Sequence, residues 1–110
     1  MNVGKFVSIS ENSEFSSVYK NAKKWYCECA VVYFLPAQTN KFAAVVSKKI
    51  GKAVIRNKCK RRIRTAFCSL EVELKCGIYV IVSKIGFDKL SYEKICSNLK
   101  WAFKKIECIK

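Results

Sequence analysis

The segment from Arg56 to Arg64 carries the side chains whose types and spacing point most directly to chemistry. On a helix of about 3.6 residues per turn, four of them gather within about a quarter of the circumference and two lie on the opposite flank. The first group is Asn57, Lys60, Arg61 and Arg64, and the second is Lys58 and Arg62. Planar guanidinium forks and ammonium groups bind phosphate oxygens. The spacing therefore predicts a helix face that binds a polyanion.

The charge of the whole chain is concentrated around this segment. The 110 residues include 22 Lys and Arg against 8 Asp and Glu, a formal net charge of +14. Residues 29–70 hold ten of those cations and no acidic residue. Leaving so many like charges unneutralised costs stability through self-repulsion, which favours a polyanion partner. A helix lying on a membrane surface is disfavoured, because the stripe of Cys59, Ile63 and Phe67 is needed for the core.

The absence of histidine and the spacing of the cysteines argue against a hydrolytic site or a zinc site. The chain has no histidine, which removes the commonest general base and the commonest zinc ligand. Its seven cysteines include no C-x-x-C pair, so we expect them to act as small hydrophobic residues in a reduced protein. The spacing therefore predicts no metal site on the protein, and a hydrolytic site on it would have to work without histidine. The N-terminal stretch has no apolar signal region and no segment is apolar enough to span a bilayer, so we expect a cytoplasmic protein without a membrane partner.

Aromatic residues provide a second candidate surface. In an alternating strand over residues 29–35, Val31 and Tyr33 point to one face. If Phe15 and Tyr19 of the preceding helix reach that face, an apolar and aromatic groove would lie near the basic helix. Unpaired RNA bases stack on such surfaces. Core packing is the alternative role for each of these residues.

The elements that must position these residues follow from apolar periodicity and from turn signals. We expect a first helix over 12–21, paired antiparallel strands over 29–35 and 42–46, and a third strand over 78–84. The basic helix is predicted to start near Arg56 or at Asn57, with Asn57 as its N-cap, and to run to about Leu74. A long last helix is predicted to begin after the N-cap Ser91. This order predicts a single α+β domain over 1–110, with helices packed against a small sheet.

Residues 42–67 strongly resemble the signature of the ribonuclease P protein family, approximately S-K-K-x-G-x-A-V-x-R-N-x-x-K-R-x-x-R. The residues that match in register are Ser47, Lys48, Lys49, Gly51, Ala53, Val54, Arg56, Asn57, Lys60, Arg61 and Arg64. Weaker similarity extends over most of the chain. The resemblance implies an α-β sandwich like that of a domain of ribosomal protein S5, with three helices and a mostly antiparallel sheet. It also implies a left-handed βαβ crossover, an exception to the usual right-handed rule.

The resemblance further implies a role beside a catalytic RNA. In that family the RNA subunit carries the catalytic site and most of the Mg²⁺, and the protein binds this RNA and the 5′ leader of precursor tRNA, so that the leader is cleaved off. Neither a membrane nor an obligate protein partner is implied. The implied RNA-binding residues are Lys48, Lys49, Arg56, Asn57, Lys58, Lys60, Arg61 and Arg64. The implied leader cleft consists of Phe15, Tyr19, Val31 and Tyr33.

Two other functions share these features. A structural protein that binds ribosomal RNA would have the same fold and charge. A DNA-binding protein is disfavoured, because an aromatic cleft suits unstacked single strands better than a duplex groove.

The chain also departs from the family pattern at three places. Lys58 replaces a frequent Arg, a Gly is expected near Ala22, and the N-terminus is less basic than is usual in the family.

Overall fold

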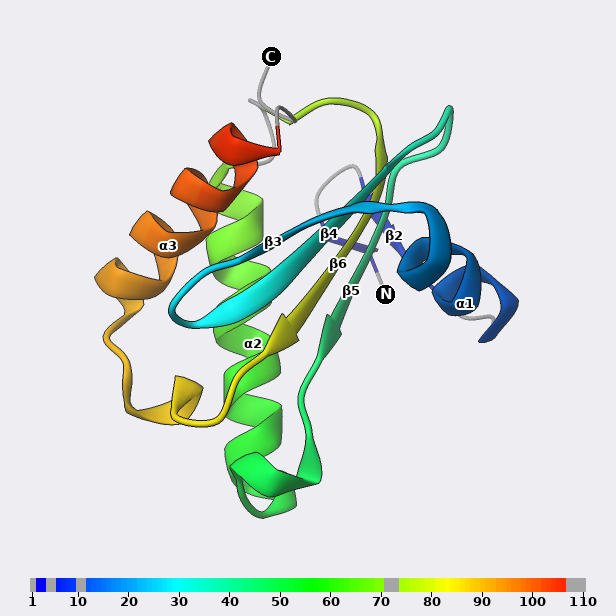
Figure 1. Ribbon diagram of the computed structural model, residues 1–110. Helices are drawn as coiled ribbons and strands as arrows, with labels where there is room; N and C mark the ends of the chain where they lie inside the picture. The colour runs from blue at the N-terminus through cyan, green and yellow to red at the C-terminus, as the bar shows by residue number, and fades with distance from the viewer. Residues whose placement is uncertain (1, 4–5, 10–11, 71–73, 107–110) are drawn as a thin grey trace.

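A computed structural model describes residues 2–3, 6–9, 12–70 and 74–106 (Figure 1). In chain order its elements are β1 (Asn2–Val3), β2 (Phe6–Ser8), α1 (Asn12–Asn21), β3 (Lys23–Tyr26), β4 (Ala30–Pro36), β5 (Lys41–Val45), η1 (Lys48–Ile50), α2 (Ala53–Leu70), β6 (Gly77–Ser83), η3 (Phe87–Lys89) and α3 (Tyr92–Lys105). None of the helices in the described ranges is long and apolar enough to cross a membrane.

The strands form one sheet in the order β1-β2-β5-β6-β4-β3. The pairs β1–β2, β4–β6 and β3–β4 are antiparallel, whereas β2–β5 and β5–β6 are parallel. Helices α2 and α3 lie on one face and α1 lies on the other (Figure 1). The expected α+β fold, with three helices and mostly antiparallel pairings, is confirmed.

The predicted strands exist, but the predicted pairing of 29–35 with 42–46 is wrong. β6 lies between β4 and β5, and its Tyr79 pairs with Phe34 on one side and with Phe42 on the other. The sequence of β6 is almost entirely apolar and five of its seven residues are buried, so it takes a central place. The parallel β5–α2–β6 connection passes behind the sheet in Figure 1 and is left-handed, as the resemblance implies.

Helix α2 begins earlier than predicted. It starts at Ala53, and the Arg56 N–H already donates to the Lys52 carbonyl at 2.9 Å. Asn57 therefore lies inside the helix, and its prediction as an N-cap is wrong. Gly51 is a poor helix residue, and the helix starts soon after it, with Ala53 as a good helix former. The helix ends at Leu70, and residues 71–73 of the predicted extension lie outside the described part of the chain.

Other local predictions hold. Helix α1 covers the predicted residues 12–21, and the strand predicted over 78–84 is observed over Gly77–Ser83. The Ser91 hydroxyl accepts a hydrogen bond from the Lys94 N–H at 3.2 Å, which confirms this residue as the N-cap of α3. These features depend on a few neighbouring residues, which is why sequence patterns identify them.

The core has two parts, one on each face of the sheet. The larger part lies between the sheet and helices α2 and α3, where Phe42, Phe67 and Tyr79 are fully buried. The smaller part lies under α1, around Val18 and Val80. The small-hydrophobe prediction is confirmed for the buried Cys27, Cys29 and Cys59. It is wrong for the exposed Cys68 and Cys76, whereas Cys96 is half-buried and Cys108 lies outside the described residues.

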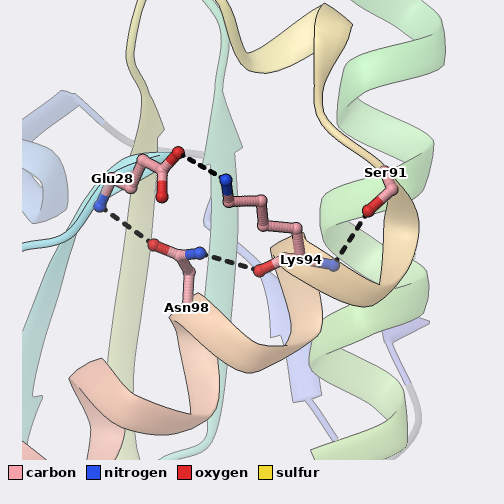
Figure 2. Close-up of polar contacts among 4 residues, drawn as sticks. All are labelled: Glu28, Ser91, Lys94 and Asn98. Atoms are coloured by element: carbon pink, nitrogen blue, oxygen red, sulfur yellow. Dashed lines mark hydrogen bonds and ion pairs between the residues drawn. The ribbon is translucent and has the colours of Figure 1, made fainter.

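The turn between β3 and β4 is tied to the start of α3 (Figure 2). The Lys94 ammonium lies 3.0 Å from a Glu28 carboxylate oxygen, and the Glu28 backbone N–H donates to Asn98 Oδ1 at 2.9 Å. Asn98 Nδ2 in turn donates to the Lys94 carbonyl at 2.8 Å. This network holds the edge of the sheet against α3.

Candidate nucleic-acid interface

Helix α2 divides its basic residues between two hollows. Arg64 lines a hollow of about 140 Å³ together with Phe15 of α1 and residues of β5. Lys58, Arg61 and Arg62 line another, of about 350 Å³, beside Tyr92 of α3. The predicted grouping of Arg61 with Arg64 is therefore only partly right. Consecutive helix residues are about 100° apart, so Arg61 stands at the boundary of the two flanks and reaches the α3 side.

The basic residues on α2 differ in their exposure to solvent. Asn57, Lys58 and Arg61 are exposed, whereas Arg56, Lys60 and Arg64 are half-buried. Half-burial places the stems of Lys60 and Arg64 against the protein while their charged heads can reach solvent. In Arg56 the burial extends to the guanidinium, whose Nε is buried without a hydrogen-bond partner among the described residues. Arg62 is different, because its Nη1 donates to the Leu90 carbonyl at 3.3 Å and so links α2 to the segment before α3.

Lys48 and Lys49 lie on η1, directly after β5. Both are exposed, and the Lys49 N–H donates to the Ser47 hydroxyl at 3.1 Å. The neighbouring Ile50 is buried in the larger core. Ile50 thus anchors the short helix to the core, whereas the two lysines are exposed. The helix lies at the same end of the molecule as the start of α2 (Figure 1).

Three of the four predicted cleft residues form a continuous series of ring contacts. The Phe15 and Tyr19 rings of α1 lie 6.3 Å apart, and Tyr19 meets Tyr33 of β4 edge to face at 5.0 Å. Val31 lies two residues from Tyr33 on the same face of β4 and is half-buried. The condition set by the sequence analysis, that the first helix reaches this face of the strand, is met by the Tyr19–Tyr33 contact. Phe15 and Tyr33 also pack on the smaller core, so a structural role accompanies any binding role.

The electrostatics of this aromatic cluster suit an anionic ligand. Burial, and then the neighbouring Tyr33 phenol, raises the pKa of Tyr19 above its ordinary value of 10.0. A tyrosine hydroxyl is already neutral at physiological pH, and the raised pKa keeps that of Tyr19 a hydrogen-bond donor in more alkaline solution as well. The neutral hydroxyl brings no negative charge near a phosphate.

The hollow shared by Phe15 and Arg64 connects the aromatic cluster to the basic helix. From Arg64 at the β5 side, the rings of Phe15, Tyr19 and Tyr33 lead across the sheet to β4. An aromatic surface that begins at a guanidinium group can take both the bases and the phosphates of a single strand.

The sequence reasoning missed β3, a strand of four residues with the sequence KKWY. Three of its residues are exposed, and no apolar alternation marks it. The available signal was the mixture of lysines and aromatic residues directly after the first helix, a composition typical of nucleic-acid-binding surfaces.

Comparison with known proteins identifies the family. The family model described as ribonuclease P matches residues 3–107. The chain belongs to the ribonuclease P protein family. A ribonuclease P protein component from Carboxydothermus hydrogenoformans is 35% identical over 101 residues, which cover 87% of each chain. Another, from Shouchella clausii, is 34% identical over 106 residues and covers 92% of this chain and 86% of its own.

Solved structures of the ribonuclease P family share the fold. The Staphylococcus aureus RNase P protein superposes with a TM-score of 0.84 at 24% identity, over 94% of this chain and 97% of that one. The RNase P protein from Thermotoga maritima superposes with a TM-score of 0.79 at 24% identity, over 91% of this chain and 97% of that one. With its family established, the chain is a protein component of ribonuclease P, with the RNA binding and tRNA processing that this membership brings.

Proposed function

We propose that this chain binds the RNA subunit of ribonuclease P and the single-stranded 5′ leader of precursor tRNA, and so promotes removal of the leader. The observation that carries the proposal is the hollow that Arg64 shares with Phe15, because it joins the basic helix to the aromatic cluster. A leader strand lying there would stack its bases on the rings and place its phosphates at the arginine.

The remaining basic residues serve the catalytic RNA in this proposal. Lys48 and Lys49 on η1, and Arg56, Asn57, Lys58, Lys60 and Arg61 on α2, contact its phosphates. Within the described ranges, no three side chains of His, Cys, Asp or Glu lie together as a metal site would require. The catalytic Mg²⁺ ions would be held mainly by the RNA, whose active site would cut the phosphodiester bond in the cytoplasm.

Reconstitution tests this function directly. The purified chain, mixed with a bacterial ribonuclease P RNA at low Mg²⁺, is expected to bring about cleavage of a leader-bearing precursor tRNA at the 5′ end of the mature tRNA. The reason is that clustered cations replace part of the Mg²⁺ that neutralises two RNA molecules. Reactions with RNA alone, and with an unrelated protein of similar net charge, serve as controls. Absence of stimulation over both controls would contradict the proposal.

Replacement of Tyr33 tests the leader cleft. Tyr33→Ala is expected to weaken binding of leader-bearing precursor tRNA by about 1–3 kcal/mol, the range for one stacked base, with little change in salt dependence. Affinity would be measured for the reconstituted enzyme with leader-bearing and leaderless tRNA. Tyr33→Phe is the matched control, because it retains the ring and should retain most of the affinity. Equal losses for both RNAs would exclude a role of Tyr33 in the leader cleft.

A further inference from the structure

We propose that Tyr26, together with Lys24 and Lys84, forms an additional base-binding subsite for the leader, one strand beyond Tyr33. Tyr26 would stack on one unpaired base, and the two lysines would bind the adjoining phosphates. This inference rests on the proposed leader-binding function and extends the surface that performs it.

The strand register places Tyr26 on the same face as the leader cleft. In the antiparallel β3–β4 pair, Lys24 lies opposite Tyr33 and Tyr26 lies opposite Val31. Residues directly opposite each other share a face of the sheet. Tyr33 and Tyr26 are therefore diagonal neighbours on that face, at a separation of roughly 7–8 Å that large aromatic side chains can bridge. The aromatic surface that begins at Arg64 thus continues to the edge strand.

The environment of Tyr26 matches what a nucleotide requires. Its side chain is 58% exposed, the largest exposure of any tyrosine in the described residues. The ammonium groups of Lys24 and Lys84 each lie 5.7 Å from its ring centroid. These contacts are near the outer limit of a cation–π interaction, so the flexible lysines can move to phosphate oxygens when a base covers the ring. Glu28, the nearest acidic residue along the chain, is paired with Lys94 and so does not oppose a phosphate here.

The strand that carries Tyr26 is held in place from its other face. Trp25 points toward the larger core and meets Trp101 of α3 edge to face, with ring centroids 5.3 Å apart. The contacts of Glu28 with Lys94 and Asn98 hold the turn that follows (Figure 2). A ring on a fixed strand loses little conformational freedom when it binds a base, which favours stacking over a merely solvated position.

A double-mutant cycle tests the subsite. Leader nucleotides of a precursor tRNA would be replaced one at a time by abasic residues, and affinity for the reconstituted enzyme would be measured with the natural chain and with Tyr26→Ala. We expect Tyr26→Ala to weaken binding roughly five-fold or more, the lower end for one stacked base. One leader position, different from the one coupled to Tyr33, should lose this effect when its base is removed. Tyr26→Phe should bind like the natural chain.

The controls separate this inference from the function on which it rests. Lys100→Ala removes an exposed lysine from α3, on the face of the sheet opposite α1, and should couple to no leader position. Lys24→Ala should make the log–log salt dependence shallower by about 0.7, the value for one single-strand phosphate contact. Coupling to Tyr33 without coupling to Tyr26 at any position would overturn the subsite alone. Absence of coupling to either tyrosine would overturn the leader cleft as well.

Discussion

The double variant Arg61→Ala/Arg64→Ala is expected to lose roughly 100-fold or more in affinity, summed over its binding of the catalytic RNA and of precursor tRNA, and its log–log salt slopes should become shallower by about 1.4 in sum. Each lost phosphate contact contributes about 0.7 to the slope for single strands, and a charge-assisted hydrogen bond contributes about 1.5 kcal/mol or more. Arg61 and Arg64 line different hollows beside α2, so each substitution removes a separate phosphate contact. Affinity measured over a series of salt concentrations gives both quantities.

A matched control separates local contacts from total charge. Lys100→Ala/Lys104→Ala removes the same two charges from exposed positions on α3, and its slope should change less. The single variants should each account for about half of the change, because the contacts are separate. Equal slopes for the two double variants would show that net charge, rather than the basic face of α2, determines RNA binding.

Phe67→Ala is expected to lower the free energy of unfolding by about 3–5 kcal/mol, a large part of the 5–15 kcal/mol typical of a domain. The Phe67 side chain is fully buried, and its ring stacks on Phe42 at 4.2 Å. It also meets Tyr79 and Phe103 edge to face, at 5.4 Å and 6.1 Å. Truncation would leave a cavity where α2, α3, β5 and β6 meet. Urea unfolding followed by circular dichroism measures the loss.

Phe67→Leu is the control for this substitution. Leucine fills most of the volume of the phenylalanine side chain, so it should lower the free energy of unfolding much less than Phe67→Ala does. The folded fraction of either variant should retain the natural salt slope, since Phe67 is buried and does not contact solvent or RNA. A loss below about 1 kcal/mol for Phe67→Ala would show that the core adjusts around the cavity, so that Phe67 does not fix α2 on the sheet.

Local elements could be predicted from sequence because their causes are local. The apolar spacing over residues 12–21 and the hydroxyl of Ser91 are each sufficient to define a helix or its start. The start of α2 was misplaced, because Asn57 has the composition of a cap but lies beyond residues that already favour a helix. Strand positions were predictable from apolar runs, whereas strand order was not. Pairing of β6 with both β4 and β5 joins segments far apart in the chain.

From the sequence alone it follows that ten of the 22 cations lie within residues 29–70, six of them on one helix, and the motif from Ser47 to Arg64 indicates the family. Side-chain type and local spacing are properties of the sequence, so they can be determined without knowledge of the fold. The tertiary structure decided which of these residues meet. Packing of α1 on the sheet brings Phe15 to Arg64, and the β3–β4 register sets Tyr26 beside Val31, one strand from Tyr33. Such contacts depend on which surfaces are buried together, and burial is a property of the whole fold.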